Sequence, residues 1–305
     1  MKILLLGKGG QVGWELQRSL APLGELVALD FDSTDYCADF TNLAGLAQTV
    51  RAIKPDVIVN SGAHTAVDKA ESEPDLVRTI NALAPGALAN VAADIGAWLV
   101  HYSTDYVFDG SGSAPWVETD APAPLSVYGR TKLEGEQLIQ ASGCKHLIFR
   151  TSWVYAARGG NFAKTMLKLA QERETLKVIN DQTGAPTSAE LLADVTAHAL
   201  RQVRSPSAQA AADLSGLYHV VASGHTTWFD YAKEVVSHVR KAYPAIKIIA
   251  NVIDPVPTSA FQTAAKRPLN SRLDTSKFQN TFKLTLPHWK QGVTRMLTEF
   301  TEKQT

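Results

Sequence analysis

The sequence has little cysteine, no excess charge of either sign and no long apolar run. Its two cysteines, Cys37 and Cys144, lie far apart and outside any CxxC pattern, which argues against a disulfide scaffold and a cysteine-based zinc site. We expect both to be buried thiols. The 30 Lys and Arg residues balance 30 Asp and Glu residues. Nucleic-acid-binding proteins usually have a basic excess, so nucleic acid is not the expected partner.

Apolar stretches in this sequence are short. None approaches the roughly 18 residues that a membrane-spanning helix needs. The run at residues 3–6 is also too short for the core of a signal peptide, and it ends in glycines. We therefore expect no membrane partner and a cytoplasmic protein. At roughly 150 residues per domain, the 305 residues suggest about two domains.

The first half alternates short apolar runs with longer amphipathic stretches. Runs that are apolar throughout are typical of strands buried on both faces, and repeated strand-helix-strand order implies a parallel sheet with right-handed crossovers. We therefore predict an α/β fold, a Rossmann-like doubly wound parallel sheet, as a dinucleotide-binding domain over residues 1–150. The predicted strands cover residues 3–6, 26–29, 57–60, 98–103 and 146–150, and the predicted helices 12–21, 43–53, 76–95 and 126–141.

The second half has a weaker pattern, which predicts a smaller, mixed C-terminal substrate domain over residues 151–305. Segments near 176–225 are expected to return to the first domain, so the two are interleaved. Residues 205–215 and 255–268 are expected to be loops, the second because it contains three prolines. Helices are predicted at residues 161–173, 189–203, 228–242 and 288–302, and strands at 176–179, 217–221 and 246–249.

A glycine-rich turn follows the first predicted strand. Gly7, Gly10 and Gly13 have GxxGxxG spacing, with Gln11 and Val12 at the start of the next helix. The first glycine permits a tight turn, the second lets backbone approach a pyrophosphate, and the third lets helix and strand pack closely. The helix N-terminus would offer free N–H groups to the phosphates. The turn predicts dinucleotide binding; a merely structural glycine turn is the alternative.

Asp30 ends the second predicted strand, where a carboxylate would accept hydrogen bonds from an adenosine ribose. That position favours NADH, whereas Lys8 in the turn could pair with the 2′-phosphate of NADPH. We expect both cofactors to be usable. Asp39 and Phe40 are candidates for flanking the adenine, with a strand end as the alternative.

Tyr128 and Lys132 form a YxxxK motif in a predicted helix. A spacing of four places both side chains on one face, where an ammonium would lower the pKa of the phenol. The tyrosine could then exchange a proton near neutral pH. Thr104 ends a predicted central strand, at the edge where doubly wound sheets bind ligands, and could donate to a reacting oxygen. A turn cap is its alternative role.

Together these residues resemble the extended short-chain dehydrogenase/reductase superfamily. Longer segments closely resemble the dTDP-4-dehydrorhamnose reductase family within it, and the resemblance covers nearly the whole chain. The segments are residues 60–71 (NSGAHTAVDKAE), 103–108 (STDYVF), 149–155 (FRTSWVY) and 181–187 (DQTGAPT). One departure is visible, because Gly9 stands where the family turn often has threonine.

The resemblance implies NAD(P)H-dependent reduction of the C4 keto group of dTDP-4-dehydro-β-L-rhamnose, the last step of dTDP-L-rhamnose synthesis. Tyr128 would donate the proton, Lys132 would tune it and hold the nicotinamide ribose, and Thr104 would stabilise the oxygen. The rhamnose would serve a bacterial cell-envelope polysaccharide such as the O-antigen of lipopolysaccharide. The residues implied to line the cofactor are Ala63, His64, Thr65 and Tyr102, and those implied to contact the sugar are Thr104, Asp105 and Trp153.

The resemblance further implies a homodimer and a structural Mg²⁺ site at its interface, held by Glu15, Glu190 and Glu299. Without the resemblance, three scattered glutamates would be ordinary helix-surface residues. Arg267 and Arg272 flank the proline-rich loop and suit diphosphate recognition, because guanidinium donates two parallel hydrogen bonds. Surface salt pairing is their alternative.

Two other classes of function stay open. An epimerase or dehydratase on the same fold would typically need an acid and a base beside the threonine, and Asp105 alone keeps that possibility. A regulator that binds a dinucleotide without catalysis, like the regulatory subunit of methionine adenosyltransferase, would not need Thr104, Tyr128 and Lys132 together.

Overall fold

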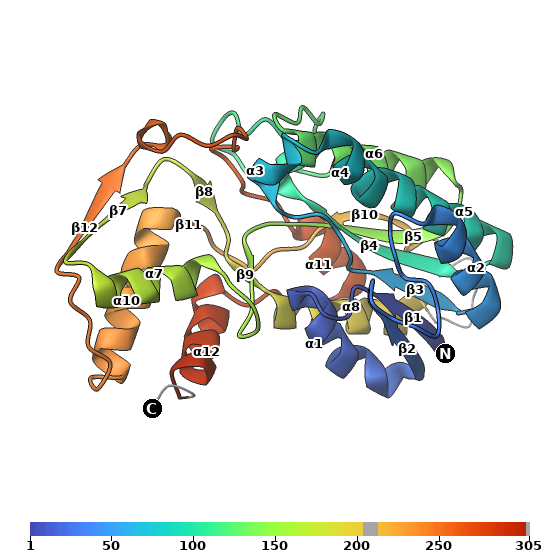
Figure 1. The fold of residues 1–305 in the computed structure, drawn as a ribbon, viewed down its shortest axis with the longest axis horizontal. Helices are drawn as coiled ribbons and strands as arrows, with labels where there is room; N and C mark the ends of the chain where they lie inside the picture. Colours follow the sequence, from blue (N-terminus) through green and yellow to red (C-terminus); the bar gives the residue numbers. More distant parts are fainter. Residues whose placement is uncertain (204–212, 303–305) are drawn as a thin grey trace.

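A six-stranded parallel sheet forms the centre of the larger of two lobes in the computed structural model, which describes residues 1–203 and 213–302 (Figure 1). The strand order is β10-β5-β4-β3-β1-β2. The predicted doubly wound α/β fold is confirmed. The strands are β1 (Lys2–Leu6), β2 (Glu25–Leu29), β3 (Val57–Asn60), β4 (Trp98–Thr104), β5 (Lys145–Thr151) and β10 (Gly216–His219).

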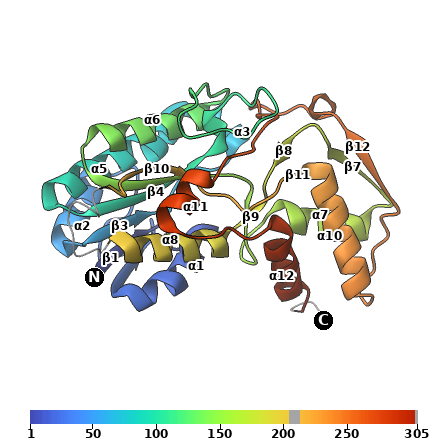
Figure 2. The ribbon, with the colours of Figure 1, turned by 180° about the vertical axis from the view of Figure 1, so that it is seen from behind.

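Helices cover both faces of this sheet, which explains why its central strands are apolar throughout. Residues of β3 and β4 are buried along their whole length. Figures 1 and 2 show one helical layer on each side. One face packs against α1 (Gln11–Leu20), α8 (Ala189–Val203) and α11 (Ser276–Phe282), and the other against α2 (Leu43–Ile53), α5 (Ala84–Ile95) and α6 (Val127–Ala141).

The chain changes direction across the sheet between β1 and β3. From β1 it moves outward to β2, and it then returns to β3 on the other side of β1 before it continues to β4 and β5. Ligands of doubly wound sheets bind at such a switch point, outside the carboxyl ends of the strands. The loops after β1, β3 and β4 therefore mark the expected site.

The helix predicted over residues 76–95 is interrupted by a π-helical segment (Thr79–Leu83) between α4 (Pro74–Arg78) and α5. π-Helical turns inside α-helices are frequent at functional sites. Shorter helices complete this lobe. They are α3 (Val67–Ala70) and the 3-10 turns Ala21–Leu23 and Asp105–Val107.

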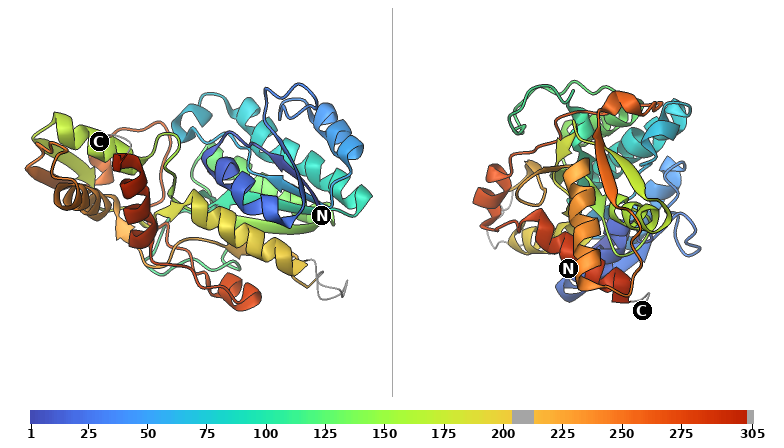
Figure 3. Two further views of the ribbon diagram at one scale, coloured as in Figure 1. Left: turned by 90° about the horizontal axis from the view of Figure 1, so that it is seen from below. Right: turned by 90° about the vertical axis from the view of Figure 1, so that its left-hand side faces the viewer.

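The second lobe lies beside the sheet, as the view from below in Figure 3 shows. Among the described residues it contains three helices, a parallel strand pair and a 3-10 turn: α7 (Phe162–Glu172), α10 (Trp228–Ala242), α12 (Trp289–Glu302), β7 (Thr175–Ile179) with β12 (Val252–Val256), and Thr258–Ala260. Two short strand pairs are β6 (Val154–Tyr155) with β9 (Thr187–Ser188) and β8 (Thr183–Gly184) with β11 (Thr226–Thr227). The domain boundaries inferred from the sequence pattern remain a proposal.

Some predicted elements of the second half are wrong. Residues 246–249 do not form a strand; the strand is β12, which begins at Val252 and includes Pro255 at the start of the predicted loop. Proline is tolerated there because β12 pairs on one side only, with β7. Helix α11 was not predicted. Most of the predicted loop 205–215 lies outside the described residues.

Cys144 is a buried free thiol as expected, but Cys37 is only partly buried. Within residues 1–203 and 213–302, none of the helices combines the length and the apolar character that crossing a bilayer requires.

Candidate functional site

The glycine turn after β1 depends on the absence of side chains. Gly7 has a φ of 84°, in the left-handed region, and a Cβ there would lie 2.7 Å from the Gly62 nitrogen. A Cβ on Gly13 would lie 1.9 Å from the Gly7 carbonyl oxygen. The Gly10 N–H donates to that same oxygen at 3.2 Å. The first and third glycines therefore let α1 start directly against the loops after β1 and β3.

The N-terminus of α1 suits a phosphate group. Its N-cap, Gly10, supplies no side-chain hydrogen bond, and the first turn contains no acidic residue. The first N–H groups of the helix thus keep their donors and the positive end of the dipole. The Gln11 side-chain oxygen is buried without a hydrogen-bond partner, and Val12 is partly buried. The free N–H groups at the start of α1 fit the diphosphate of a dinucleotide.

Asp30 folds back onto the glycine turn. Its Oδ2 accepts from the Gly9 N–H at 2.7 Å, and its Oδ1 accepts from the Phe31 N–H at 2.9 Å. A Cβ on Gly9 would lie 2.6 Å from Asp30 Oδ2. The departure from threonine at Gly9 thus lets the carboxylate approach the turn this closely. Lys8 is partly buried in the same turn.

The candidate adenine residues lie between β2 and α2. Phe40 is buried and its ring contacts the backbone of Gly62, where a Cβ would lie 2.8 Å from the ring. Asp39 accepts from the backbone and side chain of Thr41, each at 2.8 Å. Neither residue belongs to a strand, so the strand-end alternative is wrong for both.

Ala63, His64 and Thr65 form the loop after β3. The buried Asn81, in the π-helical segment, fixes this loop by accepting from the His64 N–H at 2.8 Å and donating to the His64 carbonyl at 3.0 Å. The His64 Nδ1 atom is buried without a partner, and Nε2 lies 3.8 Å from Glu73. One imidazole nitrogen of His64 is therefore buried without a hydrogen-bond partner.

Thr104 and Tyr128 approach each other where β4 ends and α6 begins. The Tyr128 ring packs edge-on against Tyr106, with centroids 5.5 Å apart. A Cβ on Gly129 would lie 2.2 Å from the Tyr106 carbonyl oxygen, so this glycine lets α6 approach the loop. Thr104 Oγ1 donates to Asp105 Oδ1 at 3.1 Å and accepts from the Tyr106 N–H at 3.2 Å. The turn-cap role of Thr104 is therefore also present.

The pKa of Tyr128 differs from the expectation. Burial raises the pKa of this phenol to about 12, the Thr104 hydroxyl opposes the rise, and the Asp105 carboxylate adds to it. The phenol is therefore protonated at neutral pH, which is the form that donates a proton. Burial likewise raises the pKa of Asp105 to about 6, and the nearby Ser271 side chain opposes the rise. Asp105 Oδ2 is buried without a hydrogen-bond partner.

Lys132 is 1% exposed and contacts the strand below it. Its Nζ donates to the Tyr102 carbonyl oxygen at 2.6 Å and lies 3.0 Å from His101 Nε2. The Tyr102 side chain points to the other face, where its hydroxyl lies 2.6 Å from the Thr196 hydroxyl. Tyr102 thus faces Lys132 through its backbone only. Burial lowers the pKa of Lys132 to about 8.

Sequence reasoning missed the buried polar side chains around Lys132. His101 and Asn60 are buried in β4 and β3, and the Glu136–Arg150 ion pair lies between α6 and β5. A signal was present, because histidine and asparagine inside otherwise apolar central strands require hydrogen-bond partners. Glu136 also continues the face of Tyr128 and Lys132 by one more turn.

Trp153 follows β5 with a left-handed φ of 48°. Its ring stacks on Trp228, the first residue of α10, with centroids 3.5 Å apart and planes at 12°. A Cβ on Gly184 would lie 2.6 Å from the same ring. Trp153 therefore joins the sheet to the second lobe, and its contact with a sugar remains a prediction.

Arg267 bridges the proline-rich segment to α3. Its guanidinium donates to Asp68 Oδ2 at 2.7 Å, and this hydrogen bond lowers the pKa of Asp68. Arg272 donates to the side chain of Asn270 at 2.8 Å. The structure thus gives Arg267 the salt-pairing role that was its alternative.

Glu15, Glu190 and Glu299 lie on three different helices, α1, α8 and α12. Burial raises the pKa of Glu15, and the charges of Glu190 and Glu299 contribute to the rise. Glu15 pairs with Arg18 at 3.7 Å, and Glu190 pairs with Arg295 at 3.1 Å. Across residues 1–203 and 213–302, no three His, Cys, Asp or Glu side chains are grouped so as to hold a metal ion. The magnesium expectation therefore lacks structural support.

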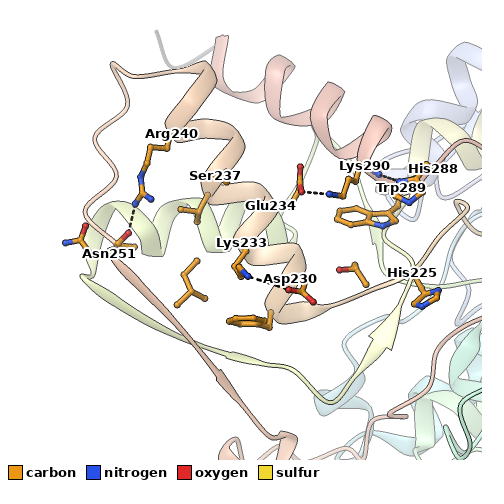
Figure 4. A pocket seen from close by; sticks show the side chains of 15 residues that line it. His225, Asp230, Lys233, Glu234, Ser237, Arg240, Asn251, His288, Trp289 and Lys290 are labelled. Atoms are coloured by element: carbon orange, nitrogen blue, oxygen red, sulfur yellow. Dashed lines mark hydrogen bonds and ion pairs between the residues drawn. The ribbon is translucent and has the colours of Figure 1, made fainter.

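A hollow of about 790 Å³ lies in the second lobe, among α10, β12 and the start of α12 (Figure 4). Its charged side chains are paired. Lys290 contacts Glu234 at 2.7 Å, Lys233 contacts Asp230 at 3.9 Å, and Arg240 donates to a backbone carbonyl. None of the predicted site residues lines this hollow, so we place the site at the carboxyl edge of the sheet.

The predicted residues of that edge are joined by continuous contacts. Gly7 touches Gly62, Asn60 contacts His101, His101 contacts Lys132, and Lys132 lies one helical turn from Tyr128. The glycine turn, the loop after β3 and the Thr104–Tyr128–Lys132 group therefore lie along one edge of the sheet. A dinucleotide on the turn would extend toward the phenol.

Comparison with known proteins finds relatives along almost the whole chain. Residues 1–302 match the family model described as the RmlD substrate binding domain. A dTDP-4-dehydrorhamnose reductase from Escherichia coli strain K12 is 62% identical over 299 residues, which cover 98% of each chain. A crystal structure of such a reductase from Clostridium acetobutylicum has a TM-score of 0.88 and 36% identity, covering 99% of this chain and 100% of the other. One from Bacillus anthracis in complex with NADP has a TM-score of 0.85 and 34% identity, covering 98% and 99%.

Proposed function

The chain belongs to the RmlD substrate-binding-domain family of dTDP-4-dehydrorhamnose reductases, and we propose that it is an NAD(P)H-dependent oxidoreductase of that specificity. It would reduce the C4 keto group of dTDP-4-dehydro-β-L-rhamnose to give dTDP-β-L-rhamnose. The observation that carries this proposal is the contact of Tyr128 with Thr104 at the end of β4, one helical turn from Lys132, at the same edge of the parallel sheet as the glycine turn after β1.

A bound nicotinamide cofactor supplies the hydride. Tyr128 donates the proton to the keto oxygen, because its pKa of about 12 keeps the phenol protonated until the oxygen becomes basic. Thr104 donates its hydroxyl hydrogen to the same oxygen, which requires it to release Asp105. The Lys132 ammonium keeps one N–H beyond its two contacts, and we assign that N–H to the nicotinamide ribose.

The dinucleotide would lie along the turn and the loop after β3. Its diphosphate would accept from the first N–H groups of α1, which are uncapped. Asp30 would accept from the adenosine ribose, and Lys8 would pair with the 2′-phosphate of NADPH. The NADP complex of the Bacillus anthracis relative supports use of the phosphorylated cofactor.

Asp105 and Trp153 are the proposed sugar contacts. Asp105 is 2% exposed, and its raised pKa leaves it partly protonated near pH 6, so it can both donate to and accept from sugar hydroxyls. A dehydratase would need a separate base in addition to this single carboxyl. The rigid stack of Trp153 on Trp228 offers an indole edge next to the carboxyl end of β5.

A coupled assay tests the proposal. dTDP-glucose is converted by the two preceding enzymes to dTDP-4-dehydrorhamnose, and oxidation of NADH and of NADPH is followed in parallel. We expect oxidation of the cofactor that requires both preceding enzymes and yields dTDP-rhamnose. A chain that binds the cofactor without oxidising it would favour the regulator, and a product other than dTDP-rhamnose would favour the epimerase or dehydratase.

The homodimer, the magnesium site, the cytoplasmic location and the supply of rhamnose to a cell-envelope polysaccharide rest on the family resemblance. The molecular mass from sedimentation, with and without a chelator, tests the homodimer and the magnesium site together. A mass that corresponds to two chains and falls on chelation supports both, and a mass unchanged by chelation removes the magnesium role.

A further inference from the structure

A short segment of the second lobe, residues 156–161 between β6 and α7, reaches the glycine turn of the first lobe. Arg158 Nε donates to the Gly9 carbonyl oxygen at 3.4 Å, although the two residues are 149 positions apart in the sequence. A Cβ on Gly159 would lie 3.5 Å from Gln11 Cγ, at ordinary contact distance. The segment therefore lies against the start of α1, where the proposed function places the diphosphate of the cofactor.

The Arg158 guanidinium is held by an aromatic ring of α1. Its central carbon lies over the Trp14 ring, 4.1 Å from the ring centroid. Trp14 is 47% exposed, so its ring is open to a cation that approaches from the second lobe. A guanidinium that stacks on a ring keeps the N–H groups in its own plane available to an acceptor. Trp14 thus holds the charge in place without using its donors.

Arg158 has no carboxylate partner in the described part of the chain. None of the ion pairs within residues 1–203 and 213–302 includes it. Its hydrogen bond to Gly9 is longer than the usual distance of about 2.7–3.2 Å and uses one of the five N–H donors of a guanidinium. The other donors therefore stay available to a ligand beside the glycine turn.

Hydrogen bonds within the second lobe fix the segment that carries Arg158. Asn161 is the N-cap of α7, and its Nδ2 donates to the Ala156 carbonyl oxygen at 2.7 Å. Lys164, in the first turn of α7, donates from Nζ to the Gly159 carbonyl oxygen at 2.8 Å. The guanidinium is therefore in place before a ligand binds, which lowers the entropy cost of using it for binding.

We propose that Arg158 binds a phosphate group of the dinucleotide and is the contribution of the second lobe to the cofactor site. This inference rests on the proposed function, which supplies the cofactor and its place on the turn. The guanidinium would stay on Trp14 and exchange its long hydrogen bond to Gly9 for two N–H donors to phosphate oxygens. The phosphate belongs either to the diphosphate at the start of α1 or to the 2′-phosphate of NADPH, and the test separates these two sources.

The charges around the turn agree with this role. Lys8 and Asp30 are the charged residues nearest to Gly9 in the turn and at the end of β2, and their formal charges cancel. The Asp30 carboxylate is itself bonded to the Gly9 N–H at 2.7 Å. Arg158 gives this part of the site a net positive charge, which a phosphate group of the dinucleotide would offset.

The first test measures the dissociation constants of NADH and NADPH in Arg158→Ala by fluorescence titration, without the sugar nucleotide. Loss of a charge-assisted hydrogen bond should weaken binding by about tenfold or more. A loss shared by both cofactors assigns Arg158 to the diphosphate, which both contain. A loss confined to NADPH assigns it to the 2′-phosphate. Arg158→Lys keeps the charge without the forked donors and should lie between the parent and Arg158→Ala.

Arg173→Ala is the matched control, because it removes the same charge from an exposed position of the same lobe, at the C-cap of α7. It should leave both dissociation constants unchanged. Circular dichroism should show the parent's melting temperature for both variants, since both side chains are exposed. An Arg158→Ala variant with the parent's affinity for both dinucleotides would overturn the proposal, as would a loss no larger than that of Arg173→Ala.

The second test observes the guanidinium itself. The Nε–H resonance of Arg158, assigned by its absence from the spectrum of Arg158→Lys, should shift on addition of ADP or of adenosine 2′-monophosphate. These two nucleotides separate the diphosphate from the 2′-phosphate, and no shift with either would contradict the proposal. A parent chain that binds NADPH through Arg158 but does not reduce dTDP-4-dehydrorhamnose would refute the proposed function alone. Turnover by the parent, with unchanged dissociation constants in Arg158→Ala, would refute this inference alone.

Discussion

The buried Glu136–Arg150 ion pair gives a prediction whose size follows from the structure. Glu136 is 1% exposed and Arg150 is 3% exposed, and two hydrogen bonds join them. Removing one partner of such a pair leaves a buried charge without compensation and costs about 3–5 kcal/mol. Arg150→Met should therefore remove a large part of a total stability that is typically about 5–15 kcal/mol.

Urea unfolding followed by circular dichroism measures this loss. With a slope of about 3 kcal/mol per M, the midpoint should fall by about 1 M. Glu136→Leu combined with Arg150→Met removes both charges and should regain most of the loss, because well-packed apolar pairs often replace buried ion pairs without cost. The single variant should also lose activity, since the unpaired Glu136 would compete with His101 for Lys132.

The matched control is Arg51→Met, which breaks the exposed Arg51–Asp94 pair. Exposed pairs contribute about 1 kcal/mol or less, so its midpoint should hardly change. An Arg150→Met variant as stable as this control would refute the reasoning about the buried pair. So would a double variant that is no more stable than Arg150→Met alone.

Three further predictions test other parts of the site. Because burial raises the pKa of Asp105 from 3.8 to about 6, its contribution to stability is present below about pH 4 and is lost as the pH rises through 6. Asp105→Asn should therefore raise the free energy of unfolding by up to about 3 kcal/mol at pH 8 and by nothing at pH 3.5, in urea titrations at both pH values. Gly13→Ala should abolish cofactor binding in fluorescence titrations, because its Cβ would lie 1.9 Å from the Gly7 carbonyl oxygen; binding of parental affinity would contradict this. Asp30→Ala should weaken the binding of NADH and strengthen the binding of NADPH, which changes the ratio of the two KM values by at least about tenfold. An unchanged ratio would remove Asp30 from cofactor selection.

Much of the sheet could be predicted from the sequence, because its strands are buried on both faces. β3 and the predicted strand at residues 57–60 coincide, and β1, β4 and β5 extend the predictions by a residue or two. The glycine turn could also be predicted, since the steric need for Gly7 and Gly13 is local. The second lobe was harder, because β12 contains a proline and pairs with one strand only.

The chemistry around Tyr128 depended on contacts that local spacing does not give. The four-residue spacing places Lys132 on the face of Tyr128, which predicts a lowered pKa for the phenol. In the fold, Nζ bonds to a carbonyl and an imidazole of β4, and burial raises the pKa of the phenol instead. The partners are about 30 residues from Lys132 in the sequence, so no helix periodicity could reveal them.

The most direct test of the central claim is the turnover of Tyr128→Phe with dTDP-4-dehydrorhamnose and NADPH. Phenylalanine keeps the ring that packs edge-on against Tyr106 and removes only the proton donor. kcat should fall by about 10²–10⁴-fold, the usual contribution of a positioned acid, while the control Tyr243→Phe in the second lobe keeps full activity. A Tyr128→Phe variant with the kcat of the parent would contradict the assignment of Tyr128 as the proton donor.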